Sequence, residues 1–210
     1  MSTGQPVLGR PAGARGEQTR RRVIAATMRC VSEVGYSRAT IREIARIAGM
    51  TSGSLYHYFP NKSELIKSTF LEIAAITVPR LSAAAEGADG VLDKLMAVFD
   101  ESDRLMREYP YAAAFDRAIR AESAGHLRLA EESDTIFSSF DEVMAGIIEQ
   151  AGREGMLGPG VDVATAAAAI LALMRGLYDH AAASPGDYHA TMGAVKLLVR
   201  GTLFDYTRLT

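Results

Sequence analysis

The sequence is poor in the features that mark secreted and membrane-spanning proteins. A single cysteine, Cys30, excludes an internal disulfide and fits a reducing compartment, and its apolar setting predicts a small buried side chain. No run of about 18 apolar residues is present, and the first residues lack the apolar stretch of a signal peptide. We therefore expect a cytoplasmic protein with no membrane partner.

Catalytic and cofactor-binding motifs are equally scarce. The four histidines, His57, His126, His180 and His189, show no zinc or di-iron spacing, and there is no glycine-rich nucleotide-binding loop. Asp179 and His180 are adjacent, but neighbouring helical positions point in different directions, which favours a surface role. We expect no enzyme activity, no cofactor and no metal, and we keep an all-α enzyme of unrecognised type as an alternative.

The charge is divided along the chain. The formal net charge is −2, but residues 1–62 carry ten Lys and Arg against three acids, a net charge of +7. Residues 63–210 carry 13 against 22, a net charge of −9. Because phosphates are neutralised by local charge, this division favours an amino-terminal nucleic-acid-binding module on a neutral-to-acidic body. A solvated basic surface without a polyanion partner is the alternative.

What is abundant is helical periodicity, and no segment shows convincing strand alternation. Residues 1–16, with four Gly and two Pro, predict a flexible basic arm. The rest predicts an all-α fold of about nine helices. Their approximate ranges are 19–34, 40–48, 51–58, 61–85, 91–108, 111–123, 125–152, 163–183 and 188–207.

Local signals set several of these limits. Gly35 is a typical left-handed cap, and Pro60 stops the third helix. "TIRE" from Thr40 and "NKSE" from Asn61 are capping boxes, in which the side chains at both ends satisfy free backbone donors. Pro79 predicts a kink in the fourth helix, because it removes one helical hydrogen bond.

Residues 41–60 have the pattern of a helix-turn-helix. The small Ala45 allows a second helix to cross closely, Gly49 can adopt the positive φ of a tight turn, and Met50 and Leu55 close the core. Any tight αα-hairpin shares part of this pattern. The first helix would expose Arg42 and Arg46.

The stretch "TSGSLYHYFPNK", residues 51–62, is polar and aromatic at once. As a recognition helix it would present hydroxyls to base edges and phosphates in the major groove, with a glycine that permits close backbone approach. Leu55, Tyr58 and Phe59 would anchor its underside. The residues expected to face DNA are Thr51, Ser52, Gly53, Ser54, Tyr56 and His57, and Lys62 suits a phosphate at the start of the next helix.

Residues 19–66, centred on "ATIREIARIAGMTSGSLYHYFPNKSEL", resemble the DNA-binding domain of the tetracycline-repressor (TetR) family of bacterial transcription regulators. The resemblance implies a homodimer on an inverted repeat in double-stranded operator DNA, an effector cavity in helices four to seven, and pairing through the last two helices. "GMLGPGVDVATAAAAILALMRGL" resembles the family in pattern only.

By position, the resemblance assigns phosphate contacts to Thr40 and Lys62, and base and phosphate contacts to Thr51–Ser54, Tyr56 and His57. We also count the exposed Arg42 among the DNA-binding residues. No Arg, Asn or Gln lies in the recognition helix, so direct base discrimination is expected to be modest. More weight would fall on DNA shape and on arginines assigned to the amino-terminal arm. These are Arg15, Arg20, Arg21 and Arg22.

The body has features of both a dimer bundle and a ligand pocket. "TAAAAILALMRGLYDHAAA" would let two helices approach closely and, with the last helix, favours a four-helix dimer bundle, although an intramolecular core is the alternative. Aromatic and thioether side chains in excess of a minimal core favour an apolar or aromatic small-molecule effector, and simple core packing is the alternative. The candidate ligand-binding residues are Phe99, Met106, Tyr109, Tyr111, Phe115, Phe137, Phe140, Met144, Met174 and Tyr178.

We therefore predict a flexible arm at residues 1–16, a DNA-binding domain at 17–66, and an effector-binding and dimerisation domain at 67–210. The predicted function is a homodimeric repressor that an apolar or aromatic ligand releases from its operator. A DNA-binding dimer controlled by a protein partner, or by no ligand, is the alternative.

Overall fold

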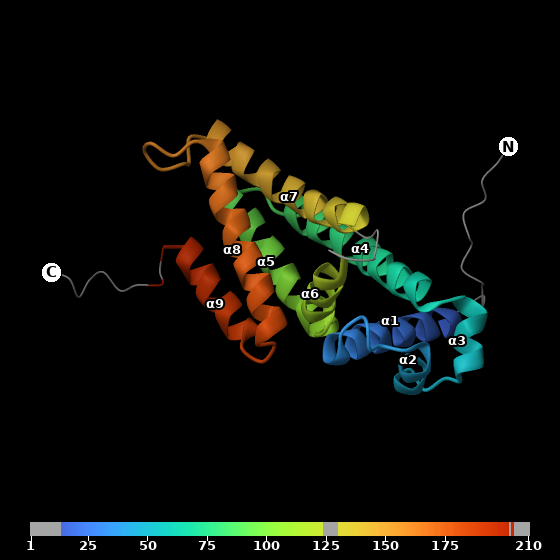
Figure 1. The fold of residues 1–210 in the computed structure, drawn as a ribbon. Helices are drawn as coiled ribbons and strands as arrows, with labels where there is room; N and C mark the ends of the chain where they lie inside the picture. Colours follow the sequence, from blue (N-terminus) through green and yellow to red (C-terminus); the bar gives the residue numbers. More distant parts are fainter. Residues whose placement is uncertain (1–13, 124–129, 202, 204–210) are drawn as a thin grey trace. The chain divides into compact units, whose positions relative to one another are not determined.

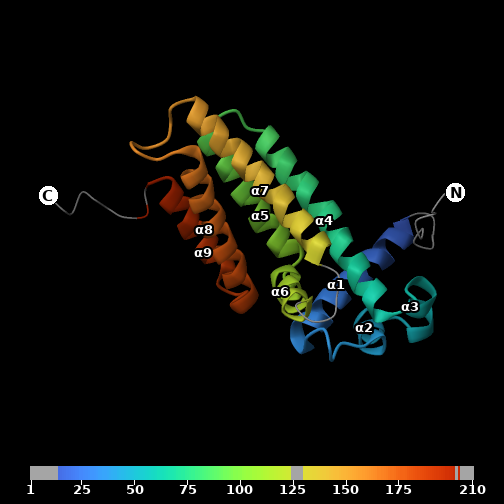
Figure 2. The same cartoon turned by 45° about the horizontal axis from the view of Figure 1, so that its top comes forward.

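The computed structural model describes residues 14–123, 130–201 and 203, with side chains described for 16–121, 140–201 and 203. All regular structure in these ranges is helical, which confirms the all-α prediction (Figures 1 and 2). The helices described are α1 Ala14–Val34, α2 Ile41–Ile47, α3 Ser52–Tyr58, α4 Lys62–Glu86, α5 Val91–Glu108, α6 Ala112–Ser123, α7 Ala130–Arg153, α8 Val163–Ala183 and α9 Tyr188–Val199.

The chain forms two compact units. One contains α1, α2, α3, α4 up to Ile73, and the segment that begins at Phe115 and takes in most of α6. The other contains the remainder of α4 from Ala74, together with α5, α7, α8 and α9. The helix α4 thus contributes residues to both units. The domain boundary after residue 66 stays a prediction.

Two further findings concern the described ranges only. None of their helices is long and apolar enough to cross a membrane. Their His, Cys, Asp and Glu side chains form no group of three or more that could hold a metal ion. Cys30 is buried in α1, and burial raises the pKa of its thiol, as expected of a small core residue.

The predicted cap residues start α2 and α4. The Thr40 hydroxyl accepts a hydrogen bond from the Glu43 amide at 3.1 Å, and Asn61 Oδ1 accepts from the Glu64 amide at 2.9 Å. In a full capping box the Glu43 carboxylate would accept from the Thr40 amide. Here it accepts a hydrogen bond from the Arg46 guanidinium instead. This pairing lowers the pKa of Glu43.

The first helix begins five residues earlier than predicted, at Ala14 rather than about Thr19. Alanine, arginine and glutamine are good helix formers, and Glu17 lies in the first turn, where the helix dipole favours an acid. Arg15, Arg20, Arg21 and Arg22 therefore belong to α1 and not to an arm, although the side chain of Arg15 is outside the described residues. Residues 1–13 of the predicted arm lie outside the description as well. Helix formers near the end of the Gly- and Pro-rich segment thus outweighed its overall composition.

The last helix ends at Val199 rather than about Thr207. Gly201 has a φ of +71° just after the end, and its amide donates to the Leu198 carbonyl at 3.0 Å, which closes the helix. Residues 204–207 of the predicted helix lie outside the description, as do residues 125–129 of the predicted seventh helix. The described part of α7 runs from Ala130 to Arg153, and α4 continues through Pro79.

In the second unit α5 is the central helix. It packs on α7 and α9, and α8 packs on the same two helices, as Figures 1 and 2 show from two sides. The amphipathic pattern of α5 buries Val98 and Phe99 completely, and Met144 of α7 and Met192 of α9 are equally inaccessible. Apolar burial therefore holds these helices together, and the polar face of α5 is left for charge pairing.

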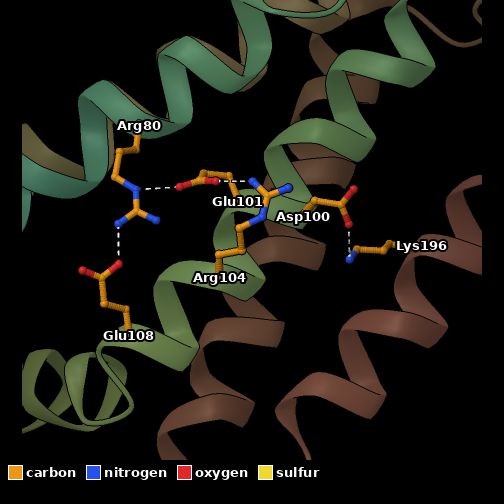
Figure 3. A network of polar contacts seen from close by, with 6 residues as sticks. All are labelled: Arg80, Asp100, Glu101, Arg104, Glu108 and Lys196. Carbon is orange, nitrogen blue, oxygen red and sulfur yellow. Dashed lines mark hydrogen bonds and ion pairs between the residues drawn. The ribbon is translucent and has the colours of Figure 1, made fainter.

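Carboxylates on α5 hold side chains from α4 and α9 (Figure 3). Arg80 of α4 reaches both Glu101 and Glu108 at 2.6 Å, and Arg104 also pairs with Glu101. One residue before Glu101, Asp100 pairs with Lys196 of α9 at 2.6 Å. The α5 helix thus joins α4 and α9 through neighbouring residues.

A second link between α5 and α9 lies close by. Asp103 pairs with His189 at 2.5 Å and with Arg107 at 2.9 Å. Burial of the Asp103 carboxyl raises its pKa, but the bonds from His189 and Arg107 outweigh burial, so the pKa lies below its ordinary value. The carboxylate therefore stays charged and keeps its partners at neutral pH.

Glu101 offers a test of these charge pairs because its carboxylate, in a side chain only 10% exposed, accepts hydrogen bonds from two arginines. We expect Glu101→Gln to lower the free energy of unfolding by about 1–3 kcal/mol, since buried bonds to charged groups are lost. Urea unfolding measures the change. The control Glu149→Gln removes an exposed pair at 4.0 Å and should stay within about 0.5 kcal/mol. Equal effects of both variants would contradict a stabilising role for the Glu101 carboxylate.

Candidate nucleic-acid interface

The helices α2 and α3 form the predicted helix-turn-helix. Gly49 adopts a φ of +64°, and the Met50 amide donates to the Ala45 carbonyl at 2.9 Å across the turn. Ala45 is 1% exposed, as expected of a small residue where two helices cross. The turn residues predicted from the sequence are thus the ones that the structure uses.

The start of α3 is fixed by one hydroxyl. Thr51 Oγ1 accepts a hydrogen bond from the Ser54 amide at 3.1 Å and lies 2.8 Å from Ser54 Oγ. Both side chains are exposed, so the two hydroxyls are held together at the surface. A bonded pair of hydroxyls still has acceptor lone pairs and one proton to offer to another molecule.

Gly53 lies in this exposed turn without an internal reason to be glycine. A Cβ built there would meet only Thr51 Oγ1, at 4.0 Å, and its φ is not in the left-handed region. Neither packing nor backbone geometry within the chain therefore requires a glycine at this position. A glycine here leaves the backbone open to close approach by another molecule.

The polar and buried residues of α3 lie on different sides. Leu55 is fully buried and Phe59 is 9% exposed, whereas Tyr56 is 55% exposed and His57 is also exposed. Tyr58 is half-buried, with its ring edge to face with that of His57. The helix therefore has an apolar underside and an outer surface of hydroxyls, an open glycine, a phenol and an imidazole. Ser52 is half-buried at the edge of this surface.

Arginines near α2 and α3 differ in what they contact. Arg46 is neutralised by Glu43, Arg21 pairs with Glu17, and Arg20 pairs with Glu72. Arg42 is exposed on α2, as predicted. Arg38, which sequence reasoning did not select, is also exposed and is held by its Nε, which donates to the Val34 carbonyl at 2.8 Å. Its place two residues before the Thr40 cap is the sequence feature that indicates a basic side chain near the start of α2.

Lys62 has internal partners that the sequence did not indicate. Its Nζ donates to the carbonyls of Tyr36 and Ser37, at 2.9 and 3.3 Å, and lies 4.3 Å from the centre of the Tyr36 ring. Tyr36 lies 26 residues earlier in the chain, and no local pattern links the two residues. The lysine predicted to contact a phosphate thus has partners within the fold, and its phosphate contact stays a prediction.

The predicted effector-binding residues are largely buried. Phe99 and Met144 are fully buried, Tyr109, Phe115 and Met174 nearly so, and Met106, Tyr111, Phe140 and Tyr178 are half-buried. Phe115 belongs to the first compact unit and the others to the second. The side chain of Phe137 lies outside the described residues. Since core packing requires the same burial, their role in ligand binding stays a prediction.

Comparison with known proteins bears on the helix-turn-helix region first. Residues 23–69, which span most of α1 to the first part of α4, match the model of the tetR family of bacterial regulatory proteins. An HTH-type transcriptional repressor of Mycobacterium tuberculosis is 29% identical over 153 residues, covering 61% of this chain and 80% of the relative. The fatty acid metabolism regulator protein of Bacillus subtilis is 24% identical over 142 residues, covering 67% and 72%.

Solved structures share the fold along most of the chain. A ketosteroid transcriptional regulator of Mycobacterium tuberculosis superposes with a TM-score of 0.71 at 19% identity, covering 93% of this chain and 97% of the other. The transcriptional regulator FadR from Bacillus subtilis, solved in complex with stearoyl-CoA, has a TM-score of 0.69 at 21% identity, with coverage of 88% and 100%. At these identities the structures support the fold alone. The matched helix-turn-helix region and the similarity to the curated repressor identify the chain as a member of the tetR family of bacterial regulatory proteins and as a DNA-binding transcriptional regulator.

Proposed function

We propose that the protein is a homodimeric repressor that places α3 of each subunit in the major groove of an inverted-repeat operator. The observation that carries this proposal is the outer surface of α3, where hydroxyls, an open glycine and Tyr56 are exposed above a fully buried Leu55. Polar groups on a rigid, buried support suit direct contact with base edges.

Each exposed residue then has a role that follows from its chemistry. Thr51, Ser52 and Ser54 offer hydroxyls to bases and phosphates, and Gly53 permits close approach of the backbone. Tyr56 and His57 lie within the same surface and suit phosphates or a thymine methyl group. Thr40 and Arg42 on α2 suit the phosphate backbone.

Sequence reading by this surface is expected to depend on DNA shape. Hydroxyls accept and donate to several bases, and α3 carries none of the Arg, Asn or Gln side chains that make bidentate base contacts. The proposed operator is therefore distinguished partly by its deformability and by the spacing of its half-sites. For a symmetric dimer that spacing is about one DNA turn, roughly 34–36 Å.

Three variants of α3 test the DNA-binding surface on a duplex selected by the wild-type protein from a randomised pool of about 30 base pairs, three DNA turns. Tyr56→Ala and Gly53→Ala should each weaken binding about tenfold, because a contact is lost or a Cβ intervenes, while thermal stability is kept or raised. Leu55→Ala should instead lower the free energy of unfolding by about 2–5 kcal/mol. Fluorescence anisotropy and thermal melting measure the two effects.

An equal loss of stability in Tyr56→Ala would place this residue in the core. A selected pool without an inverted repeat would contradict the symmetric dimer on DNA. Unchanged binding in both Tyr56→Ala and Gly53→Ala would remove α3 from the DNA interface.

We further infer that α8 and α9 form the dimer interface. Ala164, Ala168, Ala172 and Gly176 recur every four residues on α8, and all four are exposed. On α9, Leu197 and Leu198 are 43% and 44% exposed. Small residues let two helices approach closely, and the exposed leucines supply apolar surface that a second copy of the chain would bury.

A charge in this surface should separate the subunits. Ala172→Glu places a carboxylate at the centre of the small-residue row, and burying it unpaired against a second copy is unfavourable. We expect a monomer by light scattering at micromolar concentration, with helical content retained. The control Ala83→Glu, at an exposed alanine of α4, should stay dimeric. A dimeric Ala172→Glu would contradict the proposed interface.

We also propose that an apolar effector controls DNA binding through the second unit, and that a long-chain acyl-CoA is the first candidate. Two observations support this. One relative is named a fatty acid metabolism regulator, and one structural neighbour was solved with stearoyl-CoA. The candidate residues Met144, Met174 and Phe140 are adaptable or flat side chains of the kind that line acyl-binding pockets.

Release requires that the effector prefer one of two dimer conformations, in which the α3 helices are differently spaced. The helix α4 is suited to transmit the change because it contributes residues to both compact units. Its part after Pro79 is secured to α5 through Arg80, so a shift of α5 would be passed on to α4.

Stearoyl-CoA should therefore raise the melting temperature and release the selected duplex, since a ligand that binds only the folded state stabilises it by mass action. Coenzyme A without its acyl chain is the matched control and should do neither. A protein that responds to neither stearoyl-CoA nor other apolar compounds would favour control by a protein partner or by no ligand. Stabilisation without release of DNA would contradict the effector role.

A further inference from the structure

We propose that Lys62 is a positioning residue of the DNA-binding surface. It holds the loop before α2 against the start of α4 and does not bind a phosphate directly. The inference rests on the proposed function, since it assigns a role within the surface that reads DNA. It reverses the role that the family resemblance implies for this lysine.

Partners within the fold occupy two of the three donors of the Lys62 ammonium. A lysine ammonium has three N–H donors and no acceptor. Two donors are directed at the carbonyls of Tyr36 and Ser37, at 2.9 and 3.3 Å. The Tyr36 ring, whose centre lies 4.3 Å from Nζ, makes a cation–π contact with the ammonium. The residue is also half-buried, and a phosphate would have to compete with these internal partners for the ammonium.

The position of Lys62 in its helix makes these partners necessary. Lys62 is the first residue of α4, where the positive end of the helix dipole disfavours a cation. The cap at this end is already supplied by Asn61. A cation here is stable when partial negative charges surround it, and two carbonyl oxygens and an aromatic face provide them.

The partners belong to the segment that sets where α2 begins. Gly35, with a φ of +80°, ends α1, and the Ala39 amide donates back to the Gly35 carbonyl at 3.1 Å. Tyr36 and Ser37 lie within that short loop, and the cap residue Thr40 follows it directly. Holding the two carbonyls therefore holds the starting point of α2.

Lys62 thereby joins the two ends of the helix-turn-helix. The loop that it binds precedes α2, and the lysine itself follows α3 and the Pro60 turn, 26 residues after Tyr36. The contact closes the chain around α2 and α3 together. It fixes Thr40 and Arg42 relative to the hydroxyls of α3 without touching DNA.

Salt dependence separates this role from a direct phosphate contact. We compare Lys62→Met and Arg42→Met, which each remove one positive charge, on the selected duplex between about 50 and 200 mM salt. Arg42→Met should lower the slope of log affinity against log salt by about 0.9, as expected when one phosphate contact is lost. Lys62→Met should weaken binding about tenfold at every salt concentration and change the slope by less than half as much.

The measurements are made well below the melting temperature of each variant, where a residue that only supports the fold would leave affinity unchanged. Tyr36→Leu keeps the ammonium and both carbonyls and removes the ring. It should weaken binding in the same way as Lys62→Met, and the double variant should be no weaker than Lys62→Met alone. If Lys62→Met folds incompletely, the DNA affinity of Tyr36→Leu tests the proposal in its place.

Amide hydrogen exchange gives a readout that needs no DNA. The Ala39 amide should exchange faster in Lys62→Met and remain as in the wild type in Arg42→Met, because only the lysine holds the loop. The proposal is overturned if Lys62→Met lowers the salt slope by about 0.9 and leaves the exchange of the Ala39 amide unchanged, because Lys62 would then contact a phosphate. It is also overturned if Lys62→Met binds DNA with unchanged affinity. If the wild type binds no duplex, the proposed function fails, and the exchange result still decides whether Lys62 holds the loop.

Discussion

The burial of Leu55 is the constraint on which the proposed DNA-binding surface depends. A helix of seven residues, Ser52–Tyr58, is too short to be stable by its own backbone bonds, because helix nucleation is costly. It persists because Leu55 and Phe59 are buried on its underside and because Thr51 caps its start. With these contacts satisfied, its outer side is free of any packing role. The functional groups are therefore rigid and exposed together.

The second unit is organised around a different constraint, which is the polar face of α5. This helix buries Val98 and Phe99 on one side and presents Asp100, Glu101 and Asp103 to partners from α4 and α9 on the other. The apolar contacts supply most of the cohesion, while the charged contacts are directional and fix how neighbouring helices sit along α5. Such pairs contribute geometric specificity more than stability.

Much of the fold follows from local chemistry that is legible in the sequence. Thr40, Asn61 and Gly49 act within three or four residues of their own positions, so cap and turn patterns identify them. The start of α1 was missed because helix formers from Ala14 lie beside a Gly- and Pro-rich segment, and the end of α9 because Gly201 was not recognised as a stop. The contact between Lys62 and Tyr36 spans 26 residues and has no local signature. Ligand-binding side chains cannot be separated from core side chains by pattern, since Phe99 and Met144 are buried in either case.

The division of charge completes the account of how a protein with a formal net charge of −2 can bind a polyanion. Residues 63–210 carry a net charge of −9, which repels phosphates, and residues 1–62 carry +7. That value of +7 already counts Glu17, Glu33 and Glu43 against the ten basic residues, and Arg20 is paired in addition with Glu72 of the acidic part. The basic charge is thus local, and it attracts the phosphates of any DNA sequence without reading the bases. In the proposed complex, a surface with few base-reading side chains needs two copies on one duplex, and symmetry in the operator supplies the specificity that a single α3 helix lacks.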